Sequence, residues 1–329
     1  MVKCLISDST DPWFNLAVED WIFNNLEEET LFLWRNAECV IIGRNQNPWA
    51  ECDVNRMKQD GINLVRRETG GGTVFQDLGN SIFSFLSKEE DYDKDSNFGI
   101  VVSALKKMGI EAVQEGRNDI VVNDRKISGS AFKTKNGKSL HHGTLLIDAD
   151  IAKLSGYLTP HAKKLESKGT KSVAKRVVNV REIVDVDHDK FCEALIEEYF
   201  ASKNTEKNVQ ILDKEDLARI PELKEKYEFL KSHDWIFGES PEFTHKMEER
   251  FDWGLVEVNL LCESGIVKDS KIFSDALNAE MIHALAESFK GISYDKKEFV
   301  SKVNELSDRM PHERENLNSF SSWISAQVG

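Results

Sequence analysis

The most informative part of this sequence reads Arg66-Arg67-Glu68-Thr69-Gly70-Gly71-Gly72-Thr73-Val74-Phe75-Gln76-Asp77-Leu78-Gly79-Asn80. A strand pattern that carries two arginines runs into three consecutive glycines there. Glycines let the backbone adopt positive φ and come close to a ligand, which turns N–H groups toward an anion. Arginine holds phosphates through a planar, permanently charged fork. The combination predicts an anion-binding loop, and a plain glycine turn is the alternative interpretation.

This loop differs from the two common glycine-rich phosphate sites. The glycines are not followed by the Gly-Lys-Ser/Thr sequence of a P-loop, and their spacing is not the GxGxxG pattern that opens a dinucleotide-binding helix. Its chemistry must therefore be inferred from the residues around it.

Strand and helix patterns surround the loop. Asp11 followed by Pro12 and apolar residues at helical spacing predicts a capped amphipathic helix as far as Leu26. Short β-rich runs separated by Gly, Asn and Asp fill residues 30–86, and a helix is expected over Phe98–Met108. The strands predicted in this half are Leu31–Arg35, Val40–Gly43, Ile62–Arg67, Ser81–Leu86, Asp119–Val122, Lys126–Lys133 and Leu140–Asp148, with an Asn123-Asp124 turn between the fifth and the sixth.

The second half of the chain predicts helices and then a small separate module. Helical patterns dominate from Asp187 to Ser232, and a loop at Gly238–Glu242 then leads to Phe251. Beyond it we expect strands at Gly254–Leu261 and Gly265–Phe273 and helices at Ala276–Lys290, Lys296–Ser307 and His312–Gln327. The prediction is an α+β protein with a catalytic domain in residues 1–244 and a small α+β accessory domain in residues 245–329.

Composition limits the class of protein. The 329 residues are 40% hydrophobic and 30% charged, which is ordinary for a globular chain with one large and one small domain. The 57 acidic residues outnumber 43 basic ones, and the resulting formal net charge of −14 repels nucleic acid. No apolar run approaches the roughly 20 residues that cross a bilayer, and the start lacks a signal-peptide pattern, so we expect a cytoplasmic protein. Five scattered cysteines without a CxxC pair argue against a disulfide framework and a zinc site.

A second motif occupies Gly116–Ala131 and contains Asp124-Arg125-Lys126-Ile127-Ser128-Gly129-Ser130-Ala131. Strand alternation is expected to place Lys126 on one face with Ser128 and Ser130, and Ile127, Gly129 and Ala131 on the other. A lysine among small residues has room beside it for a ligand, whereas most strand lysines are simply solvated. Asn118 and Asp119, just before, offer an amide and a carboxylate suited to a nucleotide or Mg²⁺.

Two adjacent histidines, His141 and His142, begin the next predicted strand. Neighbouring strand residues face opposite sides of a sheet, so the pair cannot bind one metal and at most one of them faces the site. A structural role is the favoured interpretation.

A basic segment, His161–Arg176, has six Lys/Arg and a single acidic residue, Glu166, in this acidic chain. A loop that closes over a charged ligand and a solvated surface run are equally good interpretations of it.

Taken together, these motifs resemble those of the bacterial lipoate-protein ligases of the two-domain type. The residues that carry the resemblance span essentially the whole chain and are Ile6–Glu19, Arg35-Asn36, Gly43–Trp49, Arg66–Asn80, Gly116–Ala131, His141–Leu146, Lys163–Asn179 and Phe251–Gly254. The resemblance implies the fold shared by biotin and lipoyl ligases, a mixed β-sheet flanked by helices and related to the catalytic domain of class II aminoacyl-tRNA synthetases. A small C-terminal domain would be attached to it.

The resemblance also implies site residues. Lys126 would be the catalytic residue, since its family counterpart contacts the lipoate carboxylate and the adenylate phosphate, and the loop Gly169–Val180 would fold over the adenylate. The expected ATP- and lipoyl-adenylate-binding residues are Arg67, Gly72, Thr73, Val74, Phe75, Asn118, Lys126, Ser172 and Val177. The expected lipoate-binding residues are Arg66, Gly70, Gly71, Gly72, Lys126 and His142, and the expected metal ligand is Asp119.

One position departs from the family pattern, because Gln76 stands where many relatives have histidine. Glutamine can hydrogen-bond but cannot act as a base near neutral pH. We therefore expect a structural role for Gln76.

The implied reaction has two steps. Lipoate attacks the α-phosphorus of ATP to give lipoyl-AMP and pyrophosphate, and the lipoyl group then passes to a lysine of an acceptor protein. ATP and Mg²⁺ are expected as co-substrates, with no tightly bound cofactor. The implied acceptors are lipoyl domains of 2-oxoacid dehydrogenase E2 subunits and the glycine-cleavage carrier protein. The chain itself is expected to be a monomer whose C-terminal domain rotates between the steps.

Three alternatives differ from this in their chemistry. A lipoyl or octanoyl transferase passes the acyl chain through a cysteine thioester, but no cysteine lies between Cys52 and Cys192. A biotin ligase shares the adenylate logic but has a different glycine motif. A non-enzymatic lipoate-binding protein would bind lipoate with or without ATP and release no pyrophosphate. The sequence leaves the acyl-chain preference and the favoured acceptor open.

Overall fold

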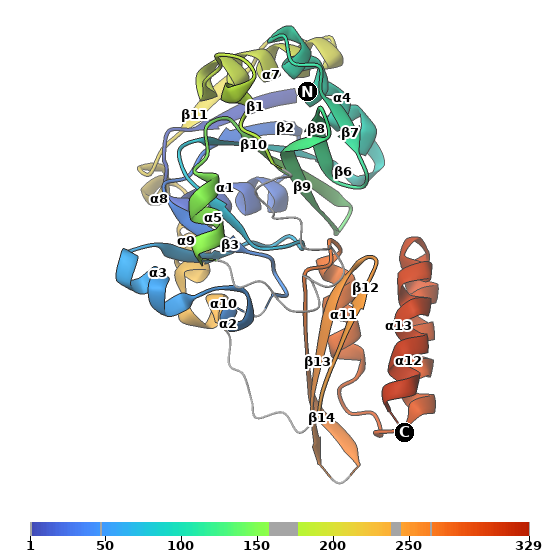
Figure 1. Ribbon diagram of the computed structural model, residues 1–329. Helices are drawn as coiled ribbons and strands as arrows, with labels where there is room; N and C mark the ends of the chain where they lie inside the picture. Colours follow the sequence, from blue (N-terminus) through green and yellow to red (C-terminus); the bar gives the residue numbers. More distant parts are fainter. Residues whose placement is uncertain (1, 47, 158–176, 238–244, 264, 329) are drawn as a thin grey trace.

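The computed structural model of the chain describes residues 2–46, 48–157, 177–237, 245–263 and 265–328 (Figure 1). A mixed eight-stranded sheet, in the order β11-β1-β2-β6-β10-β9-β8-β7, is its largest element. The strands are β1 (Val2–Ser7), β2 (Glu29–Trp34), β6 (Asn80–Lys88), β7 (Val113–Glu115), β8 (Asp119–Val122), β9 (Arg125–Lys135), β10 (Lys138–Leu146) and β11 (Val209–Leu212). Strand β1 pairs in parallel with β2 and β11, and the other pairs are antiparallel.

Helices cover both faces of this sheet. On one face, α4 (Lys94–Lys107) and α7 (His188–Lys203) bury Phe98 and Phe191 against strand residues such as Phe83. On the other, α1 (Pro12–Asn24) and α9 (Pro221–Lys231) pack Phe14 and Leu223 into a second core. Two short helices adjoin α9, namely α8 (Asp216–Arg219) and α10 (His233–Ile236). The sheet is thus buried on both faces.

A small sheet, in the order β4-β3-β5, carries the glycine motif. Its strands are β3 (Cys39–Ile42), β4 (Asn63–Arg66) and β5 (Val74–Gln76), and the helices beside them are α2 (Pro48–Glu51), α3 (Val54–Asp60) and α5 (Ile151–Tyr157). The three glycines lie between β4 and β5, which both pair with β3. The loop is therefore held at both of its ends by one central strand.

The C-terminal part has a core of its own. Strands β12 (His245–Phe251), β13 (Gly254–Glu263) and β14 (Ile266–Ser274) form an antiparallel sheet, and α11 (Ala279–Ser288), α12 (Lys296–Arg309) and α13 (Arg314–Gln327) pack against it (Figure 1). The core of this part is built from residues after 244 alone, with Phe289, Phe299 and Phe320 among them.

Most of the predicted elements are confirmed, and the local chemistry explains them. The Asp11 side chain caps α1 by accepting hydrogen bonds from the backbone N–H groups of Trp13 and Phe14. The turn between β8 and β9 has positive φ at both Asn123 (49°) and Asp124 (58°), as a tight two-residue hairpin requires. The protein is α+β, as predicted.

Several elements were not predicted, and they include β1, β5, β7 and α5 as well as elements in the regions that follow. Residues 30–86 contain α2 and α3 as well as strands, because Asp53 caps α3 and Gly61, at φ 71°, ends it. The segment from Asp187 to Ser232 contains β11, an exposed four-residue edge strand. Strand β12 was not predicted because its residues are nearly all half-buried and show no apolar alternation. The predicted Gly238–Glu242 loop lies outside the described residues.

None of the described helices is long and apolar enough to cross a membrane.

Candidate active site

Arg66 fastens the start of the glycine loop to neighbouring backbone. Its guanidinium donates to carbonyl oxygens in the turn at residues 43–46 and to those of Trp235 and Ile236, at 2.6–3.1 Å. Burial lowers its pKa to about 10, so the group remains charged near neutral pH. All three of its nitrogens donate to protein carbonyls, so in this conformation Arg66 organises the backbone around the loop.

Arg67 shapes the glycine loop from inside. Its Nη2 donates to the carbonyl oxygens of Gly70 (2.7 Å) and Gly72 (2.8 Å), and its Nε donates to Thr69 Oγ1 (3.0 Å). The side chain is buried, and burial lowers its pKa to about 10. The charged guanidinium of Arg67 therefore holds the carbonyl groups of Gly70 and Gly72 pointing toward it.

The glycines themselves meet the C-terminal part. Gly71 has φ 90°, which favours glycine, and its N–H donates to the carbonyl oxygen of Ala276 (2.8 Å). A Cβ at Gly70 would clash with the carbonyl oxygens of Ala276 and Leu277. A Cβ at Gly72 would meet nothing within 4 Å, so open space adjoins the loop at Gly72.

The three predicted residues after the glycines have different surroundings. Thr73 Oγ1 donates to Gln46 Oε1 (2.9 Å), and Val74 is 36% exposed. The ring of Phe75 is buried and stacks on Tyr157. Only the backbone of Phe75 is therefore available to a ligand.

The strand-face prediction for Lys126 is wrong. A β-bulge interrupts the pairing of β8 with β9: Ser128 pairs with Ile120 and Lys126 pairs with Val121, which leaves Ile127 as an extra residue between them. The bulge turns Lys126 to the face of Gly129 rather than that of Ser128 and Ser130, and a Cβ at Gly129 would lie 2.8 Å from Lys126 Nζ.

Lys126 pairs with Asp119 on this face. Asp119 lies directly opposite Gly129 in the β8–β9 pairing, and its Oδ1 is 2.6 Å from Lys126 Nζ. Both side chains are about one third exposed. Ala131 follows on the same face and adjoins the loop, since its Cβ is 4.0 Å from where a Cβ on Gly71 would lie. The ammonium group and the glycine loop therefore belong to one side of the sheet.

Two further predicted residues contact β9, the strand that carries Lys126. The Asn118 amide donates to the carbonyl oxygen of Ser130 (3.1 Å). Val177 forms an isolated parallel bridge with Lys126, and Val178 N–H donates to the Lys126 carbonyl oxygen (3.0 Å). Ser172, most of the Gly169–Val180 loop and the basic segment lie outside the described residues.

The two histidines face opposite sides of the sheet, as predicted. His141 lies against aromatic rings on the α4 side, with the ring centroids of Phe98 and Phe132 each 4.7 Å away. His142 is paired with Ala131 and so faces the same side as Lys126. Burial is the main cause that lowers the pKa of His141 to about 3. His141 is therefore neutral at physiological pH and belongs to the core.

A hydrogen-bonded chain connects His142 to the loop. His142 Nδ1 lies 2.9 Å from Glu19 Oε1, and its Nε2 lies 3.0 Å from Thr69 Oγ1. Ser84 Oγ donates to Glu19 Oε1 (2.5 Å) and accepts from Trp34 Nε1 (3.1 Å). Both ring nitrogens of His142 are thus engaged with protein.

Glu19 and Thr69 were missed by the sequence analysis. One signal was present for Glu19, since Asn15 and Glu19 are polar residues four apart on a predicted amphipathic helix, which places them on one face. Both are buried. Thr69 had no signal of its own, because its partners are distant in the chain.

Gln76 has the structural role that was predicted for it. It is buried, its Oε1 accepts from Asn36 Nδ2 (2.8 Å) and its Nε2 donates to Thr144 Oγ1 (3.2 Å).

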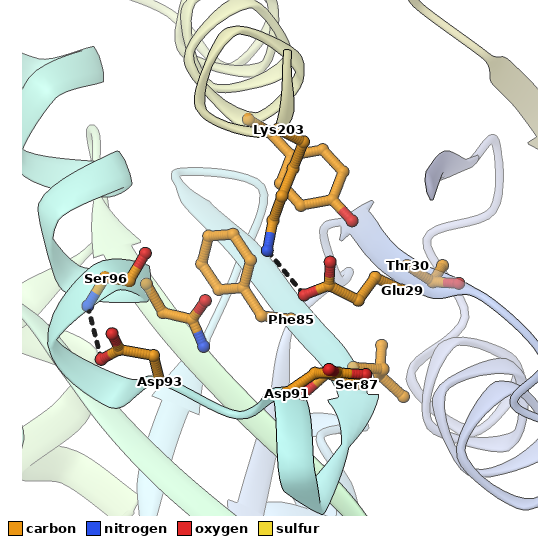
Figure 2. Close-up of a pocket in the computed structure, with 11 residues that line it drawn as sticks. Glu29, Thr30, Phe85, Ser87, Asp91, Asp93, Ser96 and Lys203 are labelled. Carbon is orange, nitrogen blue, oxygen red and sulfur yellow. Dashed lines mark hydrogen bonds and ion pairs between the residues drawn. The ribbon is translucent and has the colours of Figure 1, made fainter. Parts of the chain in front are cut away.

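A small cavity lies away from this site, on the face that α4 and α7 cover. Lys203 Nζ donates to Glu29 Oε1 there (2.7 Å), and Phe85 and Asp93 also line the space (Figure 2). Its volume of about 20 Å³ leaves room for about one water molecule. Of the predicted site residues that the structure describes, none lines this cavity, so it plays no part in the candidate site.

The donor set for a metal is sparse. Within the described parts of the chain, no three His, Cys, Asp or Glu side chains are grouped closely enough to hold a metal ion. Asp119 offers a single carboxylate, which is already paired with Lys126.

Two family models match the chain. The lipoyl protein ligase A/B catalytic domain matches residues 11–200, and the bacterial lipoate protein ligase C-terminus matches residues 240–324. Lipoate-protein ligase A of Psychrobacter cryohalolentis is 46% identical over 335 residues, which cover 99% of this chain and 99% of that protein.

Solved structures are similar as well. The structure of P. falciparum LipL1 in complex with lipoate has a TM-score of 0.88 and 35% identity, covering 99% of this chain and 100% of that one. A bipartite lipoate protein ligase from Thermoplasma acidophilum, described with its E2 lipoyl domain, has a TM-score of 0.64 and 28% identity, covering 74% and 100%. A lipoate-protein ligase A bound with ATP has a TM-score of 0.62 and 26% identity, covering 72% and 99%.

Proposed function

This chain belongs to the lipoate-protein ligase family and is an ATP-dependent ligase, and we propose that its site makes lipoyl-AMP and passes the lipoyl group to a lysine of a lipoyl domain. One observation carries the assignment of the site. The Lys126 ammonium group and the Gly70–Gly72 loop lie on the same side of the sheet, as two anionic substrates require. The relatives described with lipoate and with ATP bound support the choice of substrates.

The first step joins two anions. The lipoate carboxylate attacks the α-phosphorus of ATP, the new P–O bond forms lipoyl-AMP, and pyrophosphate leaves. A carboxylate is already a nucleophile, so the site needs positive charge and orientation more than a base. Lys126 supplies the charge, and Arg67 acts by holding the loop in shape, since its guanidinium donates to the carbonyls of Gly70 and Gly72.

The second step transfers the lipoyl group. The neutral amine of the acceptor lysine attacks the acyl carbon, its nitrogen releases one proton to solvent, the mixed anhydride bond breaks, and AMP leaves as an amide forms. Lys126 stabilises the oxyanion that develops on the carbonyl oxygen. Val177 bridges the Lys126 backbone and so borders the adenylate in this proposal.

Mg²⁺ fits this site as a partner of the nucleotide. Magnesium is often held by one or two carboxylates together with substrate phosphates, and the carboxylate of Asp119, which pairs with Lys126 in this structure, is the one expected to hold it. When bound, the ion would neutralise charge on the phosphates, and Asp119 would orient it.

In this proposal Arg66 does not contact lipoate, although the family resemblance implied that it binds lipoate. Its guanidinium is enclosed by carbonyls of the 43–46 turn and α10, so its contribution to lipoate binding is indirect. Both ring nitrogens of His142 are engaged with Glu19 and Thr69, so its contribution to lipoate binding is also indirect.

The proposed acceptors are lipoyl domains of 2-oxoacid dehydrogenase E2 subunits and the glycine-cleavage carrier protein. The Thermoplasma relative described with its E2 lipoyl domain supports this class of partner. We further propose a cytoplasmic monomer that is divided after residue 244, with a C-terminal domain that rotates between the two steps.

Intact mass spectrometry tests the proposed function. An unmodified lipoyl domain is incubated with the full chain, lipoate, ATP and Mg²⁺, and ATP is omitted from a parallel sample. We expect a lipoyl-sized mass gain on the acceptor only with ATP. No gain would favour a binding protein, and a gain that needs an acyl-carrier donor in place of ATP would favour a transferase.

A further inference from the structure

A half-buried group of charges lies just outside the glycine loop, and Glu68 is at its centre. The Glu68 carboxylate forms an ion pair with Arg44, lies 2.8 Å from Lys226 Nζ and lies 3.8 Å from Lys133 Nζ. Its side chain is 14% exposed. One carboxylate therefore contacts three cations in a half-buried position.

A second carboxylate, that of Asp20, completes this charge cluster. Asp20 lies 3.3 Å from Lys133 Nζ and 3.1 Å from Lys226 Nζ. The charge cluster thus consists of Asp20, Arg44, Glu68, Lys133 and Lys226, and the side chains of Asp20 and Lys133 are each 8% exposed. It joins α1, β9, α9 and the 43–46 turn to the glycine loop.

The balance of charges keeps Glu68 ionised. Burial by itself would raise the pKa of the Glu68 carboxyl, but Lys133, Lys226 and Arg44 together hold it below its usual range. Ion pairs of this kind are worth more than exposed ones because little water screens them.

Glu68 and Asp20 belong to different segments of the chain. Asp20 belongs to α1, whereas Glu68 lies in the loop segment between Arg67 and Thr69. Arg67 and Thr69 hold the loop toward the sheet, through the Gly70 and Gly72 carbonyls and through His142. Glu68 holds the same segment through a separate set of contacts, with cations from the 43–46 turn, β9 and α9. Three consecutive residues therefore fix the root of the loop through different partners.

We propose that Glu68 is a positioning residue for adenylate formation. It keeps the glycine loop in the position, relative to Lys126, in which the loop can contact lipoate and ATP. This inference rests on the proposed function. Removing the Glu68 charge would weaken the contacts of the loop root with Arg44, Lys133 and Lys226 and let the glycines move relative to Lys126. Misplacement by about 1 Å can cost about a hundredfold in rate. Glu68 itself touches no reacting atom.

The matched pair Glu68→Gln and Asp20→Asn separates positioning from stability. Each variant removes one carboxylate charge from the charge cluster with little change in shape, and both lose two or more contacts with its cations. Lipoate- and ATP-dependent pyrophosphate release is measured for the full chain, well below the melting temperature of each variant. We expect kcat/KM to fall about tenfold or more in Glu68→Gln and to stay within about twofold of wild type in Asp20→Asn, while both melt earlier.

Equal losses of kcat/KM in the two variants, or an unchanged kcat/KM in Glu68→Gln, would overturn the proposal. If Glu68→Gln does not fold, Arg44→Gln replaces it, because Arg44 contacts Glu68 and not Asp20 in the charge cluster. An unchanged kcat/KM in that variant would also reject the inference. Inactive wild type would instead count against the proposed function, so the two failures are distinguishable.

Discussion

The ammonium group of Lys126, on the sheet, supplies the positive charge that the proposed reaction requires. It lies 2.6 Å from Asp119 and is about one third exposed, so it is reachable from solvent. A lysine in this position contributes little to folding, because a partly exposed ion pair is worth at most about 1 kcal/mol. Its presence in the site is therefore better explained by chemistry than by stability.

Lys126→Ala is predicted to abolish adenylate formation while the fold survives. A charged donor aimed at a developing negative charge is worth about a hundredfold or more in rate. Lipoate-dependent pyrophosphate release measures the first step, and thermal melting measures the fold. Lys88→Ala, which removes an exposed lysine on β6, is the control. Near-normal adenylation by Lys126→Ala would reject the catalytic role.

At the scale of the element, β10 separates its two histidines by function. His142 faces the loop side with Glu19 and Thr69, and His141 is enclosed by rings on the other face. Alternation along an unbroken strand explains this separation. The same rule fails on β9, because the bulge beside Lys126 reverses the alternation there.

The burial of His141 predicts a pH dependence of stability. Its folded pKa is about 3, whereas an unfolded histidine has a pKa of about 6.5. Between these values the unfolded chain binds more protons, so the free energy of unfolding rises with pH across this window and levels off above it. His188, whose pKa burial lowers to about 4, acts in the same direction.

Urea unfolding at several pH values between 4 and 8 tests this dependence. His141→Asn cannot titrate, so its unfolding free energy should change less with pH than that of wild type, even though the variant is less stable throughout. Parallel curves for the two proteins would show that His141 does not contribute.

The bulge on β9 makes Gly129 a second test of the site. A Cβ at Gly129 would lie 2.8 Å from Lys126 Nζ and 2.9 Å from its Cε, so the flexible amine would have to move. Gly129→Ala is therefore predicted to lower the rate of adenylation about tenfold or more and to change the melting temperature little. Gly99→Ala on α4, where a Cβ meets nothing, is the control. An unchanged rate in Gly129→Ala would place the active position of Lys126 elsewhere.

At the scale of the whole molecule, the glycine loop connects the two parts of the chain. Gly71 N–H donates to the Ala276 carbonyl, Ser274 N–H donates to the Asn45 carbonyl (2.5 Å), and Asn45 Nδ2 donates to the Ala279 carbonyl (3.0 Å). These contacts are mostly between backbones and leave no space for a side chain at Gly70. The position of the C-terminal part and the shape of the loop are therefore coupled.

Gly70→Ala is predicted to displace the C-terminal part from the loop. The added Cβ would meet the carbonyl oxygens of Ala276 and Leu277, which are backbone atoms and cannot yield as a side-chain end can. Small-angle X-ray scattering should give a larger radius of gyration than for wild type, and Gly99→Ala should leave it unchanged. Identical scattering from Gly70→Ala and wild type would mean that the loop alone absorbs the clash.

The sequence alone was sufficient for several features that depend on neighbours along the chain. The Asp11 cap of α1, the Asn123-Asp124 turn and the opposite directions of His141 and His142 all follow from caps, φ preferences and strand alternation. The family motifs likewise identified the ligase family, and they predict Lys126 as its catalytic residue. Gln76 was assigned a structural role because its chemistry excludes a base.

Contacts between residues that are far apart in the sequence could not be predicted from these local patterns. Arg66 is enclosed by carbonyls about 170 positions away, Gly71 bonds to Ala276, and the Glu68 cations come from three separate elements. The sequence around an arginine or an acidic residue looks the same whether its side chain binds a ligand or another part of the protein. The packing of the elements decides which partner such a side chain contacts. It also decides to which face a bulged strand turns Lys126. Neither is determined before the chain has folded.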